Sequence, residues 1–524
     1  MRKLVLPASP ALCAFLLVGS WAMVAAAQPA GGYQQSAPSR DGYYEPPPGA
    51  TLGQSTAPFT AGQQRLEPSS QEYLPPSEAR PDEASGDQPT AEAAEGHVVG
   101  SDLGMKATWR NGLEIESAHK DFRVHIGGRT QFDGVWLDAE GVALAGAGGV
   151  LDDDAVAFRR ARLRADGTMY ELIDFALEYD FVNSVNDNVG LQPASEMLGN
   201  VVHVTAPTDL WFNVKEVPFV SNVRIGNMKE PIGLEHLTSS RYLDFMERSF
   251  NQDAFTGPFN NGFSPGVMIW HTTENERWHW DLGVFKNTTN IFAFGLGDGE
   301  YAATGRLAFL PWFDEASGGR YLAHLAASGS FRDLDDGRIR YRSRASLRNG
   351  PGVVNPVLAD TGFFFGDDQT LVGTEAALVL GPLLLQSEYI GSYVSDGVAG
   401  GIARGTVFVH GYYVEALYFL TGEHRAYDHE RGAFGRVVPY ENAFWTRGGR
   451  GRGAWQIGVR YAKLDLRDSG IDGGVIQDVT LGLNWFWNPN MKLQWNYVFT
   501  HRDAPGAPVG GDIHGVGMRL AHDF

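Results

Sequence analysis

The sequence predicts an all-β protein, namely a transmembrane antiparallel β-barrel of about 16 strands with loops folded into its interior. Three observations predict this fold. Apolar and polar residues alternate along many short segments, aromatic residues stand at the ends of most of these segments, and the chain ends in a phenylalanine. In a membrane-spanning barrel, successive side chains face lipid and lumen in turn, and aromatic side chains gather at both membrane surfaces.

The chain begins with the pattern of a secretory signal peptide at residues 1–27. Arg2 and Lys3 form a basic start, residues 12–18 are apolar, and three alanines at 25–27 form a small-residue cleavage site. We therefore expect an exported protein. Its only cysteine, Cys13, lies in this segment, so we expect neither disulfides nor thiol catalysis in the mature chain. No later apolar run reaches the roughly 18 residues of a transmembrane helix.

Residues 28–96 are rich in Pro, Gln, Ser, Ala and Glu and contain few aliphatic side chains. Such a segment buries too little apolar surface to offset its chain entropy, so we predict that it is disordered. It is either a passive linker or a segment that contacts the periplasm or the cell wall.

Residues 97–524 form the predicted barrel domain. Period-two alternation runs through residues 122–133, 175–181, 455–461, 479–487 and 491–499. We count 16 to 18 such segments, and closed single-chain bacterial barrels favour an even number. In the last strand, Val516, Met518, Leu520, His522 and Phe524 share one face, which resembles the C-terminal signature of outer-membrane barrels, although His522 departs from its usual apolar residue.

One basic stretch stands out from a chain with a formal net charge of −20. The acidic background argues against nucleic acid as a partner. Arg338, Arg340, Arg342 and Arg344 alternate with other residues, so an extended backbone places all four on one face. Guanidinium groups donate paired hydrogen bonds to oxyanions, and the stretch is therefore a candidate anion pathway. The alternative is a solvated edge strand or loop.

The same alternation places further cations in the lumen. Arg160, Arg162 and Arg164 share one face, whereas Arg159 breaks the pattern and is expected at a strand end or a bulge. Residues 231–261 are too long for a turn. We interpret them as a constriction loop whose cationic residues are His236, Arg241 and Arg248.

Residues 112–524 resemble the phosphate-selective porin O/P family. The motifs that carry the resemblance are LEIE at 113–116, FRVHIGGR at 122–129, FRRAR at 158–162, GLE at 233–235, TSS at 238–240, MER at 246–248, LTGE at 420–423 with Tyr427, NW at 484–485 and the terminal strand. The resemblance implies a homotrimer of 16-stranded outer-membrane barrels with infolded loops and a ladder of arginines that leads to a central constriction.

Carried over residue by residue, the resemblance assigns Arg338, Arg340 and Arg342 to the ladder, Arg159 and Arg160 to the constriction, Arg248 to a loop and Arg129 to the first strand. Arg344 and Arg348 continue the run by parity. One departure concerns His236, because members that prefer phosphate have lysine there. A neutral imidazole offers one donor and no charge, which weighs against phosphate selectivity but not against anion preference.

The sequence therefore predicts an outer-membrane porin, without a cofactor, that passes phosphate or similar small anions. Two alternatives remain open: a general diffusion or sugar porin, and a barrel that mainly anchors the N-terminal segment. A sugar channel is less expected, because the strand aromatics in the segments above fall on the lipid side. An enzyme is not expected. GFSPG at 262–266 fits a serine-nucleophile pattern, but Pro265 lacks the N–H that would form the oxyanion hole.

Two sets of polar residues outside this pathway are interpreted as surface features. His424, His429 and Glu430 lie close together without a recurring metal-ligand spacing. Acidic residues cluster at 152–154, 333–336 and 367–368, where they either solvate loops or bind divalent cations. Asp335 and Asp336 directly precede the arginine run, and for these two a third alternative is that they order the run through ion pairs.

Overall fold

The computed structural model describes residues 97–101, 103–139, 154–185, 202–257, 262–287, 292, 299–334, 337–348, 355, 357–446, 449–503 and 511–524. All of them belong to one compact unit, Pro75–Phe524. The expected signal peptide, the expected disordered segment, and Asp335 and Asp336 lie outside the described residues.

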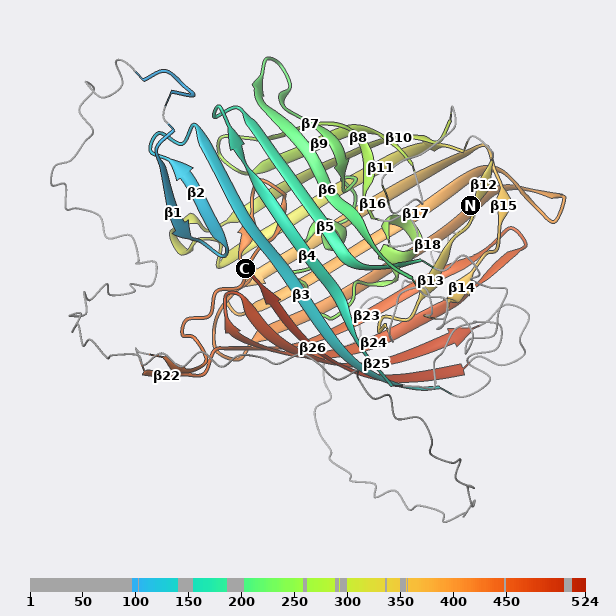
Figure 1. Cartoon of the computed structure of the whole chain (residues 1–524). Coiled ribbons are helices and arrows are strands. Elements are labelled where there is room, and N and C mark those ends of the chain that lie inside the picture. Colours follow the sequence, from blue (N-terminus) through green and yellow to red (C-terminus); the bar gives the residue numbers. More distant parts are fainter. Residues whose placement is uncertain are drawn as a thin grey trace, which may run out of the picture. The chain divides into compact units, whose positions relative to one another are not determined.

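Within the described residues, sixteen strands close into one antiparallel barrel (Figure 1). They are β3 (Phe122–Ala139), β4 (Ala155–Met169), β5 (Ile173–Val185), β6 (Val202–Val217), β7 (Ser221–Met228), β8 (Ser264–Thr272), β9 (Trp278–Lys286), β10 (Tyr301–Phe313), β11 (Tyr321–Asp333), β16 (Asp368–Leu380), β17 (Leu383–Ala399), β18 (Ile402–Phe419), β23 (Ala454–Asp468), β24 (Ile471–Asn488), β25 (Met491–Asp503) and β26 (Gly511–Asp523). Each pairs with the next, and β26 pairs with β3 to close the ring. The predicted fold class is confirmed.

The barrel is apolar outside and polar inside, as the alternation predicts. On β3, Phe132 and Trp136 are 42% and 46% exposed on the outer surface, whereas Arg129, Gln131 and Asp133 are buried on the inner one. This inversion of the soluble-protein pattern suits a wall that separates lipid from an aqueous lumen.

The predicted irregularity at Arg159 is a bulge in β4. Arg160 pairs with Gln131 and Phe158 pairs with Phe132, which leaves Arg159 as the extra residue between two consecutive partners. A bulge re-aims the side chain of the extra residue. Arg159 can therefore point into the lumen beside Arg160 although the two are consecutive.

Turns at one end of the barrel are short, for example residues 170–172, 381–382 and 489–490. Most connections at the other end are longer. In outer-membrane barrels the short turns lie on the periplasmic side, and this end also carries the chain terminus after β26.

Three long connections each fold into the barrel with part of their described residues, whereas the described part of the hairpin at 444–451 stays largely exposed. Residues 229–263 contain α2 (Leu234–Leu237) and the single-turn π-helix η3 (Gln252–Thr256). Residues 334–367 contain β12 (Arg338–Ile339), β13 (Arg342–Arg344), β14 (Val357–Asp360) and β15 (Phe364–Phe365). Residues 420–453 enter from the short-turn end and contain β19 (Tyr427–Asp428), β20 (Ala433–Phe434), β21 (Phe444–Thr446) and β22 (Gly449–Gly451).

The remaining strands, β1 (Met105–Trp109) and β2 (Leu113–Ser117), lie outside the closed ring. β2 pairs with the first residues of β3, and β1 pairs with β2, as the blue arrows of Figure 1 show. Among the described residues, no helix has both the length and the apolar character needed to cross a bilayer.

Candidate functional site

The connection at residues 229–263, which we call the constriction loop, is fastened to several strands of the barrel wall. The amide of Glu235 donates to Glu388 on β17 at 2.6 Å, and its carboxylate pairs with Arg460 on β23 at 2.9 Å. Arg129 on β3 donates to Ser240 at 2.8 Å. Because β17, β23 and β3 lie at separate positions around the ring, the constriction loop crosses the lumen.

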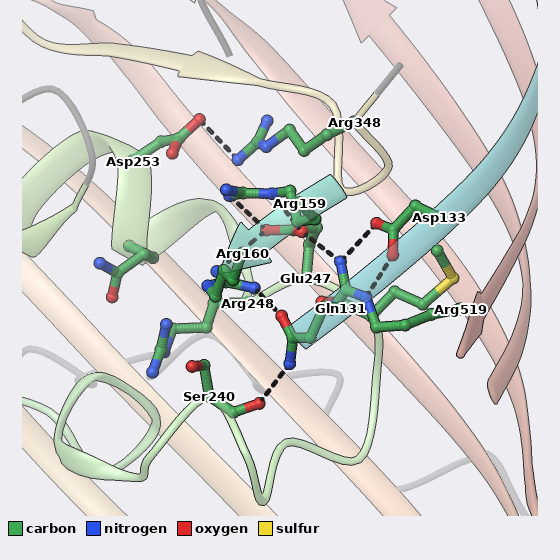
Figure 2. A network of polar contacts seen from close by, with 12 residues as sticks. Gln131, Asp133, Arg159, Arg160, Ser240, Glu247, Arg248, Asp253, Arg348 and Arg519 are labelled. Carbon is green, nitrogen blue, oxygen red and sulfur yellow. Dashed lines mark hydrogen bonds and ion pairs between the residues drawn. The ribbon is translucent and has the colours of Figure 1, made fainter. Parts of the chain in front are cut away.

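Glu247 is the centre of a charged network on this loop (Figure 2). Arg159 donates to its carboxylate at 2.8 and 3.0 Å, and Arg519 at 2.8 Å. The guanidinium of Arg160 lies 3.8 Å away and donates to Gln131 at 2.7 Å. Arginines from β4 and β26 thus converge on a single loop carboxylate.

The network around Glu247 carries more positive than negative charge. Ion pairs around the constriction join five guanidinium groups, from Arg159, Arg160, Arg344, Arg348 and Arg519, to three carboxylates, from Asp133, Glu247 and Asp253. Burial would raise the pKa of Glu247, but the surrounding guanidiniums hold that pKa well below its usual value. With five guanidiniums against three carboxylates, a formal excess of two positive charges remains. Low-dielectric walls focus such an excess into the lumen.

The predicted arginine run at 338–344 keeps its alternation in part. Ile339, Tyr341 and Ser343 are buried, with at most 8% of each residue exposed. Arg338, Arg340 and Arg342 are more exposed, and we call these three the arginine row. The run is not one continuous strand, because β12 and β13 are separated by residues 340–341.

Members of the arginine row have aromatic and acidic neighbours. The guanidiniums of Arg338 and Arg340 lie 4.2 and 5.1 Å from the ring centre of Phe363. Arg340 also binds both carboxylate oxygens of Asp360. Burial and the neighbouring Arg340 lower the pKa of Arg342 to about 10, so Arg342 remains a cation at neutral pH.

Arg344 and Arg348 lie in a different environment from the arginine row. Both are 6% exposed, and both pair with Asp253 of the constriction loop, at 3.1 and 2.8 Å. Burial would raise the pKa of Asp253, but these two guanidiniums hold it below its usual value. The pair of arginines therefore attaches the connection at 334–367 to the constriction loop.

Other predicted residues line the lumen with defined partners. Arg162 pairs with Asp180 at 2.7 Å and with Glu178 at 3.1 Å. Glu178 also binds Arg129. Arg164 pairs with Asp209 at 2.9 Å.

His236 and Arg248 lie at the end of α2. Arg248 donates to the carbonyls of Glu235 and Thr238 at 2.7 Å each, and the ammonium of Lys229 donates to the carbonyl of His236. The two cations satisfy carbonyls that a helix end leaves unpaired. The His236 ring is 5% exposed and contacts Gln252 at 3.1 Å. Burial, Lys229 and Arg248 lower its pKa well below the usual value, so the imidazole is neutral at physiological pH.

Several important residues were absent from the predicted site. Arg460 and Arg519 could have been found, because both fall on the polar side of alternating strands. Glu247 lies inside the MER motif. Asp253 and Asp360 lie in loops without periodicity, and no pattern in the sequence indicates their partners. Asp360 forms an ion pair with Arg340 of the run. The ion pairs considered for Asp335 and Asp336 lie outside the described residues.

The two rival chemical sites have simple structural surroundings. Ser264 lies in strand β8 and donates to Glu230 at 2.8 Å, so it is not at a strand-to-helix turn. His429 contacts the carbonyl of Glu276 at 3.0 Å. In the part of the chain that the structure describes, no three His, Cys, Asp or Glu residues converge as metal ligands.

Comparisons with known proteins agree with this architecture. A sequence model of the family described as phosphate-selective porin O and P matches residues 130–524. Porin O of Pseudomonas aeruginosa is 25% identical over 469 residues, which cover 83% of this chain and 96% of that protein. An uncharacterized protein of Caulobacter vibrioides is 28% identical over 438 residues, which cover 80% of this chain and 77% of that protein.

Two solved structures that match this chain are more distant in sequence. The outer-membrane channel DcaP of Acinetobacter baumannii is 12% identical, with a TM-score of 0.47 over 78% of this chain and 99% of that chain. An anion-selective porin from Comamonas acidovorans is 12% identical, with a TM-score of 0.41 over 77% of this chain and 100% of that chain.

Proposed function

Because the chain belongs to the phosphate-selective porin O and P family of outer-membrane barrels, we propose that it forms a water-filled, anion-selective channel for phosphate or similar small anions. The observation that carries this proposal is the positive excess around Glu247, on a loop that crosses the lumen. Rings of arginine in a pore favour anions.

The anion passes along a series of weak sites rather than one tight site. The arginine row leads toward the constriction. Two residues there, Arg344 and His236, hold the loops in place. The cations of the constriction are Arg129, Arg159, Arg160, Arg162 and Arg248. Most of these guanidiniums already share a carboxylate or a carbonyl, so each holds a passing anion weakly. Weak, repeated sites admit an ion and still release it, which conduction requires.

A second candidate is a general anion porin without phosphate preference. The neutral, buried ring of His236 favours it, since this position offers no ammonium to a phosphate dianion. Lys229 and Arg248 lie nearby, but both donate to carbonyls of α2.

The experiment that tests the proposal is single-channel recording in a planar bilayer under a salt gradient, with phosphate titrated into chloride. We expect an anion-selective reversal potential, and we expect Arg340→Ala with Arg342→Ala to lower the anion-to-cation permeability ratio about threefold or more. Block of chloride current by phosphate would support phosphate selectivity, and selectivity without block would support the general anion porin. A cation-selective pore, or an unchanged ratio in the double variant, would contradict the proposal.

We further propose that residues 1–27 are a cleaved signal peptide, that residues 28–96 link the barrel to a periplasmic or cell-wall partner, and that three copies of the barrel at 97–524 assemble into a trimer. Mass spectrometry of the mature chain tests the cleavage of the signal peptide. Light scattering of the detergent-solubilised protein tests the trimer. Deletion of residues 28–96 separates the linker from the channel, since the channel should still conduct.

A further inference from the structure

Arg224 on β7 differs from several other arginines that face the lumen. Arg306, Arg332 and Arg460 each pair with a carboxylate, at 2.6, 2.9 and 2.9 Å. Within the described residues, the side chain of Arg224 has neither a hydrogen bond nor an ion pair, and its Nε is fully covered without an acceptor. Arg224 is part-exposed as a residue, so a ligand can reach the guanidinium from the side of its terminal nitrogens, and no group of the described chain occupies them.

Two tryptophans frame this guanidinium. Its central carbon lies 4.3 Å from the ring centre of Trp211 on β6 and 5.3 Å from that of Trp270 on β8. Arg224 pairs directly with Asn213 and Met268, so the two indoles are its diagonal neighbours on the adjacent strands. Stacking on the two aromatic faces holds the guanidinium in place, but the rings accept no hydrogen bond from its N–H groups.

The two indoles are themselves fixed by hydrogen bonds. Trp211 donates its Nε1–H to Asp209 at 3.2 Å, and Trp270 donates to Asn213 at 2.7 Å. Both rings are half-buried, and both pack against an apolar cluster of Met228, Met268, Phe285 and Ala302. The cluster itself is at most 4% exposed, so it holds the two indoles in place, and the indoles form the apolar surface beside the cation.

The carboxylates in electrostatic range of Arg224 have other partners. Asp209 pairs with Arg164 at 2.9 Å, and Asp281 pairs with His279 at 3.0 Å. β7 starts directly after a short turn at residues 218–220, so Arg224 lies in the periplasmic half of the barrel. The constriction loop follows the other end of β7, so the surroundings of Arg224 are a site separate from the constriction.

We propose that Arg224, Trp211 and Trp270 form a binding site for organic anions that carry a flat apolar group next to a carboxylate. A guanidinium binds a carboxylate through two parallel N–H bonds. The exposed parts of the two indoles then remove the flat group from water, a gain that acetate or phosphate cannot make. The site deepens the proposed function, because it rests on anions reaching it through the pore.

The test compares benzoate with acetate as blockers of chloride current, each added on the side of the short turns. We expect half-block at a benzoate concentration about tenfold below that for acetate, a difference of about 1.4 kcal/mol. Arg224→Gln should raise the half-blocking benzoate concentration about tenfold, while Trp211→Leu and Trp270→Leu should remove the advantage of benzoate over acetate. Equal block by both anions in the unmodified protein, or unchanged benzoate block in Arg224→Gln, would overturn the proposal.

A matched control and a second readout keep the outcomes apart. Arg467→Gln removes an arginine that is exposed at the opposite end of the barrel, where it pairs with Asp503, and it should leave the block unchanged. Saturation-transfer NMR of benzoate on the detergent-solubilised protein detects the site without conduction. If benzoate binding depends on Arg224 but the pore is not anion-selective, the proposed function is refuted and this site is supported. If the pore is anion-selective but benzoate binding does not depend on Arg224, the proposed function is supported and this site is refuted.

Discussion

Each arginine that lines the lumen must be stabilised against the cost of burying its charge. Arg519, for example, is 1% exposed and pairs with both Asp133 and Glu247. A buried charge without a partner is costly, whereas a paired one is tolerated. The lumen is therefore not a bare positive surface, and its carboxylates contribute to selectivity as much as its arginines do.

Replacement of Glu247 by glutamine should separate these two contributions. Arg159, Arg160 and Arg519 would then face a neutral amide, so we expect a higher anion-to-cation permeability ratio. Removal of one partner from a buried pair costs about 3–5 kcal/mol, so the constriction loop should also loosen and add noise to the open-channel current. Reversal potentials and current noise report both effects. Glu441→Gln, at an exposed ion pair with Arg452, is the control, and an unchanged ratio in Glu247→Gln would disprove the assignment.

His236 should not respond to mild acid. Burial and the cations Lys229 and Arg248 lower its pKa well below the usual value, so its ring stays neutral as the pH falls from about 8 to 6. We expect His236 to contribute nothing to any change of reversal potential over this range, so His236→Gln should follow the same pH profile as the unmodified protein. In the unfolded chain the same ring takes up a proton near pH 6.5, so the stability that it contributes is present above that pH and declines below it. Selectivity that titrates near pH 6.5 in the unmodified protein, but not in His236→Gln, would contradict this expectation.

At the scale of elements, the barrel is a rigid frame and the loops set its chemistry. β13 pairs with β14, and this hairpin joins the constriction loop through Asp253 and through a ring contact of 5.9 Å between Phe255 and Tyr341. Functional residues commonly lie on loops that a scaffold positions. The arginine row therefore depends on the docking of two loops for its place in the lumen.

Substitution of Asp253 by asparagine should undock these loops. Arg344 and Arg348 would lose the carboxylate that they share, at a cost of about 3–5 kcal/mol. We expect several conductance levels in place of one, together with faster proteolysis between residues 337 and 367. Asp360→Asn is the matched comparison, because it frees only Arg340 and should raise anion selectivity while a single conductance level persists. One stable level in Asp253→Asn would show that other contacts hold the loops.

At the scale of the whole molecule, period-two alternation was enough to predict the barrel, its polar lumen and an irregularity at Arg159, because it reports which face a residue occupies. Alternation does not report how deep in the lumen a side chain lies, or with which residue it forms an ion pair. The Asp253–Arg344 pair joins residues 91 positions apart in two aperiodic loops. The connection at 420–453 was not predicted to fold inward, since only its contacts, such as Arg306 with the carbonyl of Gly432 at 2.8 Å, place it there. Trp211 and Trp270 also escaped notice, because the aromatic residues considered were those on the lipid side.

Closure of the barrel also depends on a contact that alternation does not reveal. The amide of Phe524 donates to the carbonyl of Gly128 at 3.1 Å, and the amide of Gly128 donates back at 2.7 Å. A Cβ on Gly128 would lie 2.6 Å from the carbonyl oxygen of Arg162 and 3.0 Å from the Phe524 ring. Phe524 therefore packs against β3 at Gly128, where there is no room for a side chain.

Gly128→Ala should impair the seating of Phe524 and thereby the closure between β26 and β3. We expect the fraction of refolded, heat-modifiable barrel on electrophoresis to fall at least about twofold, because backbone must shift by several tenths of an ångström to admit the methyl group. Gly329→Ala in β11 is the control, since its Cβ would meet only the Leu371 carbonyl oxygen at 3.7 Å, an ordinary contact. If both variants refold equally well, the contact with Phe524 is not needed for closure, and the pairing of β26 with β3 is sufficient without it.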